Sequence, residues 1–350
     1  MTAARPAGPA RMRARHLHPA PQPAAAAAPS GARTLPTAAG GAPAARPPRS
    51  AAATARAWAE LLRIPAVFTV PGDVLAGTAA AGARAGRSTA LAIGASVCLY
   101  EAGMALNDWA DRDEDAVQRP RRPLPSGRIR PRAALAAAGT LSVAGLALAA
   151  CAGRRTFAVA APLAATVWAY DLKLKHTPAG PVAMAAARSL DLLLGAAATD
   201  GPLRPALAPA ALLGSHTCAV TLVSRREAEG GSTTAPLVAL AATAAVATTV
   251  SGEAGVLRGA KGLRGADVSR EGAVRSALAL GYGVTFARPL AHAVLNPSPV
   301  LTQRAVGAGI RATIALQGAL AARVGAPGTG LLTTALAPVA ARLARRVSTT

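Results

Sequence analysis

Residues 133–153 read AALAAAGTLSVAGLALAACAG, and no residue in this run carries a charge. A stretch of about 20 apolar residues is long enough for a helix to cross a lipid bilayer. Two further uncharged runs, 205–223 and 232–252, lack the polar stripe that a surface helix of a soluble protein shows. We therefore predict an all-α protein, a multi-pass transmembrane helical bundle, and not a soluble Ala-rich bundle.

The composition of the whole chain agrees with a membrane protein. Of its 350 residues, 52% are hydrophobic and 15% are charged, whereas a soluble domain carries about 25% charged residues. The formal net charge of +22 comes largely from Arg in the first 56 residues and in short loops. No basic module with interleaved aromatic residues is present in the sequence, so we expect no nucleic-acid partner. Arg beside apolar spans is typical of cytoplasmic loops of membrane proteins.

Two regions follow from these patterns. Residues 1–56 contain Ala, Pro, Gly and Arg without an acidic residue, and we predict that they form a disordered basic tail. Residues 57–345 are predicted to form the transmembrane domain, with about nine spans. The predicted spans are 60–83, 89–106, 133–152, 156–170, 180–199, 205–223, 233–251, 273–295 and 305–323, followed by a further apolar segment at 331–341.

The order of the spans predicts which loops share a side of the membrane. If the basic tail is cytoplasmic, the loops at 107–132, 171–179, 224–232 and 296–304 are all cytoplasmic. The loop at 252–272 falls on the opposite side although it carries four basic residues, which weakens this topology without reversing it. We expect a multi-pass protein of the cell membrane whose site faces the cytoplasm and whose surroundings are membrane lipid.

The first of these loops, NDWADRDEDAVQRPRRPLPSG at 107–127, gathers carboxylates at the end of an apolar run. In a continuing helix, Asp108, Asp111 and Asp115 stand at i, i+3 and i+7 on one face. Asn107 aligns with Asp111 and Asp115 at i, i+4 and i+8. Such a stripe needs a counter-charge, and oxygen ligands of this kind suit Mg²⁺. The alternative is a solvated acidic helix end paired locally, for example Asp108 with Arg112.

A guanidinium-rich turn follows the aspartates. Arg119, Arg121 and Arg122 precede Pro-Leu-Pro-Ser-Gly, which cannot continue a helix. Carboxylates followed by guanidinium groups suit a diphosphate that is held through both metal and Arg. We predict that Asn107, Asp111 and Asp115 bind the metal and that Asp108 supports them.

The stretch resembles the UbiA superfamily of intramembrane prenyltransferases. Asn107, Asp108, Asp111 and Asp115 match that family's first aspartate-rich motif, NDxxDxxxD, and RPLPSG follows it at 122–127. Residues 58–77 look like the family's first helix, and Tyr170, Lys173 and Lys175 resemble its Tyr/Lys loop. The resemblance covers about residues 57–325. It implies a Mg²⁺-dependent enzyme that transfers a prenyl group from a prenyl diphosphate to an acceptor, here an unidentified lipid-soluble or aromatic molecule.

The sequence departs from the family at its second aspartate-rich motif, where this chain reads SRREAEGG at 224–231. Three interpretations stay open: Glu227 holds a second Mg²⁺, Arg225 takes over neutralisation of the diphosphate, or transfer activity has been lost. The predicted residues divide into two sets. Those expected to be catalytic are Asn107, Asp108, Asp111, Asp115, Arg122, Lys173 and Lys175, and those expected to bind substrate are Arg119, Tyr170, Arg225 and Glu227.

Two other functions remain as alternatives. One is a non-catalytic or transport-type membrane protein that keeps a prenyl-lipid pocket. The other is a soluble isoprenyl diphosphate synthase, which the uncharged spans disfavour. Within the fifth span, Arg188 and Asp191 stand at i, i+3. Because ionisable groups at that depth are usually paired, we expect either a structural ion pair or a role in acceptor binding.

Overall fold

The structure is a computed structural model, and it describes residues 50–227, 232–252 and 270–347. Within these ranges every regular element is helical, so the predicted all-α class is confirmed. The predicted tail lies outside the described residues up to position 49. Residues 51–56, which the composition assigns to the tail, belong instead to the first helix. This helix begins there because the Ser50 hydroxyl accepts a hydrogen bond from the Ala53 amide and the following residues are strong helix formers.

The helices of the N-terminal half alternate with short turns. Their bounds are α1 Ala51–Leu61, η1 Ile64–Thr69, α2 Pro71–Ala80, α3 Arg87–Ala110, α4 Arg112–Gln118, α5 Pro131–Ala152, α6 Arg154–Ala169, η2 Tyr170–Leu174 and α7 Gly180–Ala197. The C-terminal half contains η3 Arg204–Ala206, α8 Leu207–Ser224, α9 Thr234–Ser251, α11 Arg270–Leu295, α12 Pro299–Arg323 and α13 Pro327–Val347. Proline stands at the start of several of these helices, where its missing N–H costs nothing.

Eight of the nine predicted spans each correspond to one helix, and the further apolar segment at 331–341 lies within α13. The first predicted span, 60–83, is wrong as a single helix, because prolines at the start of η1 and of α2 divide it into the end of α1, η1 and α2. Among the described residues, five helical segments are long and apolar enough to cross a membrane. They are Arg87–Ala110, Pro131–Ala152, Arg204–Ser224, Thr234–Ser251 and Pro299–Arg323. The count of nine spans therefore stays a prediction, while the membrane-embedded helical architecture is supported.

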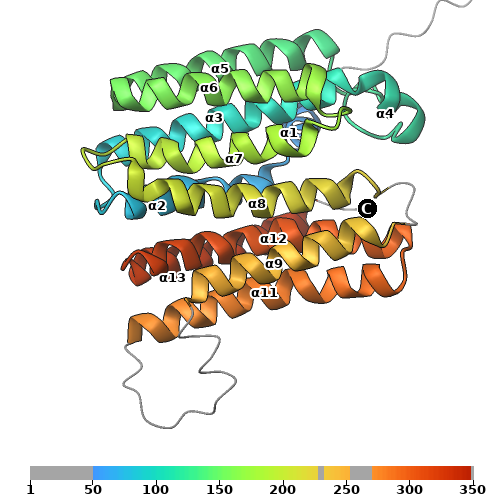
Figure 1. Cartoon of the computed structure of the whole chain (residues 1–350). Helices are drawn as coiled ribbons and strands as arrows, with labels where there is room; N and C mark the ends of the chain where they lie inside the picture. Colours follow the sequence, from blue (N-terminus) through green and yellow to red (C-terminus); the bar gives the residue numbers. More distant parts are fainter. Residues whose placement is uncertain (1–49, 228–231, 253–269, 348–350) are drawn as a thin grey trace, which may run out of the picture. The chain divides into compact units, whose positions relative to one another are not determined.

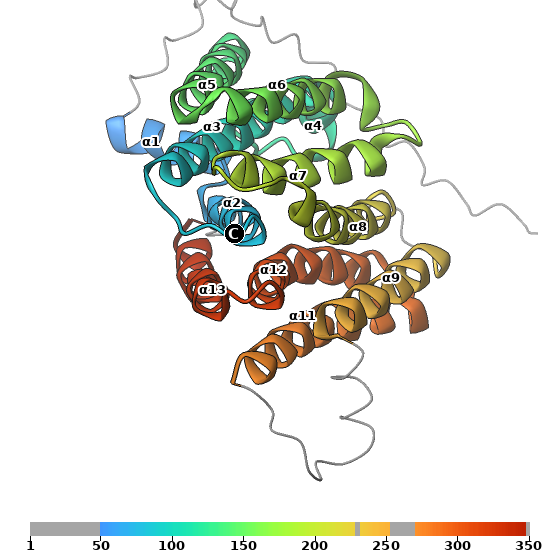
Figure 2. The same cartoon turned by 60° about the vertical axis from the view of Figure 1, so that its left-hand side comes forward.

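The bundle has two groups of helices with α2 between them. Helices α3, α5, α6 and α7 pack together, while α8, α9, α11, α12 and α13 form the second group (Figures 1 and 2). Helix α2 contacts α7 on one side and α12 and α13 on the other. The C-terminal ends of α3 and α8, together with α4, lie at the same end of the bundle, as the alternation of spans predicts (Figure 1).

Close approach of small residues holds α2 against α7. A Cβ built on Gly77 would lie 1.8 Å from the Leu192 carbonyl oxygen, and one on Gly195 would lie 2.0 Å from the Val74 carbonyl oxygen. The two backbones therefore touch through a pair of glycines, the kind of contact that drives helix association in a membrane, where lipid removes the hydrophobic contribution. This packing brings the polar residues of α2 next to those of α7.

Candidate functional site

The aspartate-rich stretch spans two helices rather than one. Helix α3 ends at Ala110, and α4 starts at Arg112 after a break at Asp111, whose φ is −89° and ψ is 4°. Backbone hydrogen bonds from the Asp111 amide to the Asn107 carbonyl and from the Asp115 amide to the Asp111 carbonyl bridge the break. The break places three acidic residues, 113–115, in the first turn of α4, where the helix dipole favours negative charge. The continuous helix expected through Asp115 is therefore interrupted.

Two of the aspartates face the guanidinium-rich turn. Arg122 Nη1 lies 2.6 Å from Asp115 Oδ2 and 3.4 Å from Asp108 Oδ1, so one side chain joins both carboxylates. Arg63 Nη2 adds a contact of 3.1 Å to Asp108, and Arg119 Nη1 lies 4.0 Å from Asp115. Both aspartates are buried, so this pairing supplies the counter-charge that the stripe requires.

The backbone of the turn holds Arg122 in place. The Ser126 hydroxyl donates a hydrogen bond of 2.6 Å to the Arg122 carbonyl, and the Gly127 amide bonds to the Leu124 carbonyl. Gly127 has a φ of +66°, a conformation that residues with a side chain rarely adopt. The RPLPSG segment is thus a fixed turn that directs a guanidinium back at the aspartates.

The local pairing of Asp108 with Arg112 does not occur. Arg112 instead lies 3.3 Å from the exposed Asp113, donates to the Trp109 carbonyl and stacks over the Trp109 ring. The partner of Asp108, Arg63, comes from the junction of α1 and η1, 45 residues earlier. The acidic helix end is therefore not simply solvated.

The third aspartate, Asp111, faces the loop after α6. The Lys175 ammonium contacts Asp111 Oδ1, and His176 Nε2 lies 3.8 Å from the same oxygen. Single ligand atoms of Asp111, Glu114 and His176 lie within 4.8 Å of one another. Of the two predicted lysines, Lys175 is therefore at the site, whereas Lys173 is exposed. Asp115, the other predicted ligand, lies against Arg122 and not in this group.

The remaining predicted ligand, Asn107, contacts a residue that the sequence patterns did not single out. Its Nδ2 donates a hydrogen bond of 3.1 Å to Asp171 Oδ1. Asp171 belongs to η2, a single π-helical turn of a type that is common at functional sites. Burial raises the pKa of the Asp171 carboxyl to about 7, against the opposing effects of the Asn107 hydrogen bond and the Lys175 charge. Its position directly after Tyr170 in the Tyr/Lys loop was the available signal.

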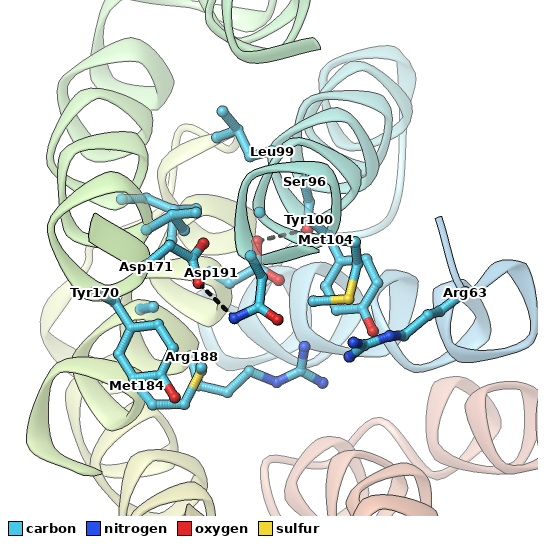
Figure 3. A pocket seen from close by; sticks show the side chains of 15 residues that line it. Arg63, Ser96, Leu99, Tyr100, Met104, Tyr170, Asp171, Met184, Arg188 and Asp191 are labelled. Carbon is cyan, nitrogen blue, oxygen red and sulfur yellow. Dashed lines mark hydrogen bonds between the residues drawn. The ribbon is translucent and has the colours of Figure 1, made fainter. Parts of the chain in front are cut away.

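A cavity of about 280 Å³ opens beneath these groups (Figure 3). Asn107, Tyr170, Asp171 and Arg63 line it near the aspartate motif. Most of the wall is apolar: Leu99, Gly103, Met104, Leu163, Val167, Met184 and Ala187. The remaining lining residues are Ser96, Tyr100, Arg188 and Asp191.

Arg63 enters this cavity from a strained backbone. Its φ of +50° is the only positive value found for a residue other than glycine in the described chain. Such a conformation costs on the order of 1–3 kcal/mol and is found preferentially at functional sites. Figure 3 shows its guanidinium pointing toward that of Arg188, which comes from the opposite wall. The sequence patterns had not identified Arg63.

The loop at 224–231 is described only as far as Glu227. Arg225 donates a hydrogen bond to the Thr177 carbonyl, which joins the end of α8 to the loop that carries Lys175. Glu227 is half-buried, and its amide bonds to the Ser224 carbonyl. In the structure Arg225 thus binds the Tyr/Lys loop. Three of the four loops predicted to share one side are linked through these contacts.

The comparison with protein families identifies the chain. The model of the UbiA prenyltransferase family matches residues 66–257, more than half of the sequence. The chain is a member of the UbiA prenyltransferase family.

A curated relative and two solved structures extend this assignment. A digeranylgeranylglyceryl phosphate synthase from Methanopyrus kandleri is 37% identical over 124 residues, which cover 35% of this chain and 45% of the relative. The match thus spans about half the length of that relative. A UbiA homolog from Aeropyrum pernix K1 in its apo form has a TM-score of 0.56 at 20% identity, covering 73% of this chain and 96% of that one. A UbiA homolog from Archaeoglobus fulgidus bound to GPP and Mg²⁺ has a TM-score of 0.53 at 16% identity, covering 80% and 99%.

At these identities the structural likeness concerns the fold. Nearly the whole length of each solved UbiA homolog has a counterpart in this UbiA family member. The matched family region, 66–257, contains the aspartate motif, its Arg turn, the Tyr/Lys loop and the end of α8. Except for Arg63, the groups that meet around Asp111 and Asp171 therefore come from the matched region.

Proposed function

We propose that this protein transfers a prenyl group from a prenyl diphosphate to an acceptor at the end of the bundle where Asp111 meets Lys175. The observation that carries the proposal is the contact between the aspartate motif and the Tyr/Lys loop beside a mostly apolar cavity, which Asn107, Tyr170 and Asp171 of these two segments line. Charged groups at this contact suit a diphosphate, and the apolar wall suits an isoprenoid chain. The family assignment supports the same reaction class.

The donor set around Asp111 fits a divalent cation. Asp111 and Glu114 offer carboxylate oxygens close together, and Asn107 keeps its amide oxygen because its Nδ2 is bound to Asp171. Oxygen donors of this kind suit Mg²⁺. We assign Asn107 and Asp111 as ligands, with Glu114 beside them. Asp115, which lies against Arg122, would hold that guanidinium in place for the diphosphate. When bound, Mg²⁺ neutralises charge that develops on the leaving diphosphate.

The cationic side chains of this protein would share that task. Arg122, Lys175 and Arg63 each contact an aspartate of the motif, so they are held in position before a substrate arrives. Preorganised positive charge in a poorly hydrated site stabilises the negative charge that forms as an allylic C–O bond breaks. The acceptor's nucleophilic atom then bonds to the allylic carbon, and its proton passes to the departing diphosphate. Lys173, Arg119 and Arg225 would add positive charge around the diphosphate, and Glu227 would lie beside them.

The placement in the cell also belongs to this proposal. The basic residues of the loops at 107–132 and 171–179 lie at the same end as the site, which by the positive-inside rule would face the cytoplasm. We infer a multi-pass protein of the cell membrane that takes its prenyl diphosphate from the cytoplasmic side. The folded domain would begin at α1 and reach position 345.

The test is incubation of membranes that contain the protein with labelled prenyl diphosphates of several chain lengths and Mg²⁺. Release of diphosphate is measured, and lipid extracts are analysed by mass spectrometry for prenylated products. Because relatives include a digeranylgeranylglyceryl phosphate synthase, geranylgeranylglyceryl phosphate is one acceptor probe. We expect diphosphate release above that of membranes without the protein. No release with any donor would contradict the proposal.

A second candidate function is non-catalytic binding or transport of a prenyl lipid. It is favoured by the loop at 224–231, where Arg225 binds a backbone carbonyl and the family's second aspartate pair is absent. It predicts saturable binding of a prenyl lipid without turnover for every acceptor tried, so the same incubation separates the two functions.

A further inference from the structure

A second group of charged and polar side chains contributes Ser96, Arg188 and Asp191 to the wall of the cavity. It consists of Asp73 of α2, Ser96 of α3, Arg188 and Asp191 of α7, and Gln317 of α12. We call these residues the inner cluster. All of them except Arg188 are buried, and the Arg188 side chain is only 15% exposed. Ionisable residues inside a membrane bundle are costly and therefore indicate a function.

The contacts of the inner cluster differ from the pair expected from the sequence. Arg188 Nε lies 3.0 Å from Asp73 Oδ2, and its Nη2 donates to the Thr69 carbonyl. Gln317 Nε2 donates a hydrogen bond of 2.6 Å to Asp73 Oδ1. The guanidinium expected to pair with Asp191 is thus bound to Asp73, because the glycine contact between α2 and α7 brings Asp73 alongside.

Asp191 therefore has hydrogen-bond partners other than Arg188. Ser96 donates a hydrogen bond of 2.5 Å to Asp191 Oδ1, and the described residues offer Asp191 no ion pair within 4 Å. Asp73 is close enough to interact with it electrostatically. One guanidinium therefore faces two carboxyl groups. Asp191 is the member of this pair that lines the cavity, so it is the carboxyl group that a molecule in the cavity can contact.

The cavity connects Asp191 to the aspartate motif. Arg188, Asp191 and Ser96 line the same space as Asn107 and Asp171, as Figure 3 shows for the labelled members of this set. Ser96 and Asn107 lie on α3, separated by 11 residues, which corresponds to about 16 Å along the helix. Along α3, the apolar residues Leu99, Gly103 and Met104 line the cavity between Ser96 and Asn107, while Arg63 and Arg188 point toward each other across it. An isoprenoid chain would gain nothing from the carboxyl and the guanidinium of the inner cluster.

We propose that the inner cluster binds the acceptor, and that the acceptor is a small molecule with several hydroxyl groups rather than a lipid or an aromatic acid. Asp191 would accept a hydrogen bond from one hydroxyl, and Arg188 would donate to another oxygen. Both side chains lie on the cavity wall, and they are three residues apart on α7. A second hydroxyl would then point along the cavity toward the allylic carbon. This assignment rests on the proposed transfer reaction and names its acceptor class.

The experiment uses the full chain in detergent with Mg²⁺ and labelled geranyl diphosphate. Two quantities are measured for each variant: diphosphate release without acceptor, and transfer to a panel of polyols from glycerol to inositol. The panel also contains 4-hydroxybenzoate and geranylgeranylglyceryl phosphate. We expect transfer to at least one polyol and to neither of the other two. Asp191→Asn is expected to raise the KM for that polyol at least about tenfold, which is the effect of losing a hydrogen bond to a charged group. The release of diphosphate without acceptor and the KM for geranyl diphosphate are expected to stay unchanged.

A matched control is Glu101→Gln. Glu101 lies in α3 and is a buried acid like Asp191, but it does not line the cavity. The Glu101→Gln variant is expected to leave both diphosphate release and transfer to the polyol unchanged. Ser96→Ala, which removes only the hydroxyl that binds Asp191, should shift the polyol KM in the same direction by a smaller factor.

The outcomes distinguish a failure of the acceptor assignment from a failure of the proposed function. Transfer confined to the lipid or the aromatic acid overturns the acceptor assignment, as does diphosphate release by wild type without transfer to any polyol. An equal loss of release and transfer in Asp191→Asn also overturns it, because a purely structural role would weaken both. No diphosphate release by wild type, from geranyl diphosphate or from the donors of other chain lengths in the test of the proposed function, overturns that function and the acceptor assignment with it.

Discussion

Arg122 Nη1 lies 2.6 Å from Asp115 Oδ2, so the turn after the aspartate motif is bound to the motif that precedes it. The same nitrogen reaches the buried Asp108. Arg122→Ala would leave two buried carboxylates short of a counter-charge. We expect a loss of about 2 kcal/mol in unfolding free energy. This is less than the roughly 3–5 kcal/mol of a broken, fully buried pair, because a quarter of the Arg122 side chain is exposed.

The measurement is the thermal unfolding of the purified protein in detergent, with diphosphate release assayed in parallel. Arg132→Ala is the control, since Arg132 is an exposed residue at the start of α5. Equal unfolding temperatures for the two variants would show that the Arg122 turn does not stabilise the motif.

Asp111 is the aspartate whose carboxylate faces both the cation-binding group and Lys175. Asp111→Ala is expected to reduce diphosphate release from an allylic substrate at least about 100-fold, since it removes charge stabilisation where the leaving group forms. Asp113→Ala is the matched control, because Asp113 lies two residues away and its side chain is 87% exposed. Undiminished release by Asp111→Ala would remove Asp111 from the site.

The helices of this protein were predictable because uncharged runs of about 20 residues have few other stable states in a membrane. The run at 133–153 became α5, and the aspartate motif fell at the end of α3 as its position after an apolar run indicates. Lys175 was identified through the Tyr/Lys loop, and the structure brings it to Asp111. Local sequence information was sufficient for these features.

The pairing of the charges could not be read in the same way. Arg63 binds an aspartate 45 residues away, and Asp73 binds Arg188 across 115 positions. The first contact depends on how the junction of α1 and η1 packs against α3, and the second on how α2 packs against α7. The spacing of residues along one helix reveals neither. The i, i+3 spacing of Arg188 and Asp191 suggested a pair, but the approach of α2 gave Arg188 another partner. Sequence spacing therefore located the charged residues more reliably than it located their partners.

Removal of divalent cations tests the metal assignment. Chelation with EDTA is expected to abolish prenyl transfer, and Mg²⁺ should restore it because the carboxylate and amide oxygens near Asp111 suit a hard cation. Glu114→Gln should raise the Mg²⁺ concentration needed for half-maximal activity several-fold without changing maximal activity greatly. Gln118→Glu is not a suitable control, since Gln118 is hydrogen-bonded to Glu114. The exposed Asp113→Asn serves instead, and an equal Mg²⁺ requirement in both variants would contradict a role for Glu114.

The glycine contact between α2 and α7 is expected to control the inner cluster from a distance. Gly195→Ala would place a Cβ about 2.0 Å from the Val74 carbonyl oxygen, which two packed backbones cannot accommodate. Helix α2 must then move away from α7, and the 3.0 Å contact between Asp73 and Arg188 would lengthen. We expect a lower unfolding temperature and loss of transfer. Gly139→Ala is the control, because a Cβ added at Gly139 on α5 would have nothing within 4 Å and Ala is the better helix former by about 1 kcal/mol. If Gly195→Ala and Gly139→Ala unfold at the same temperature, the α2–α7 contact does not require a glycine at position 195.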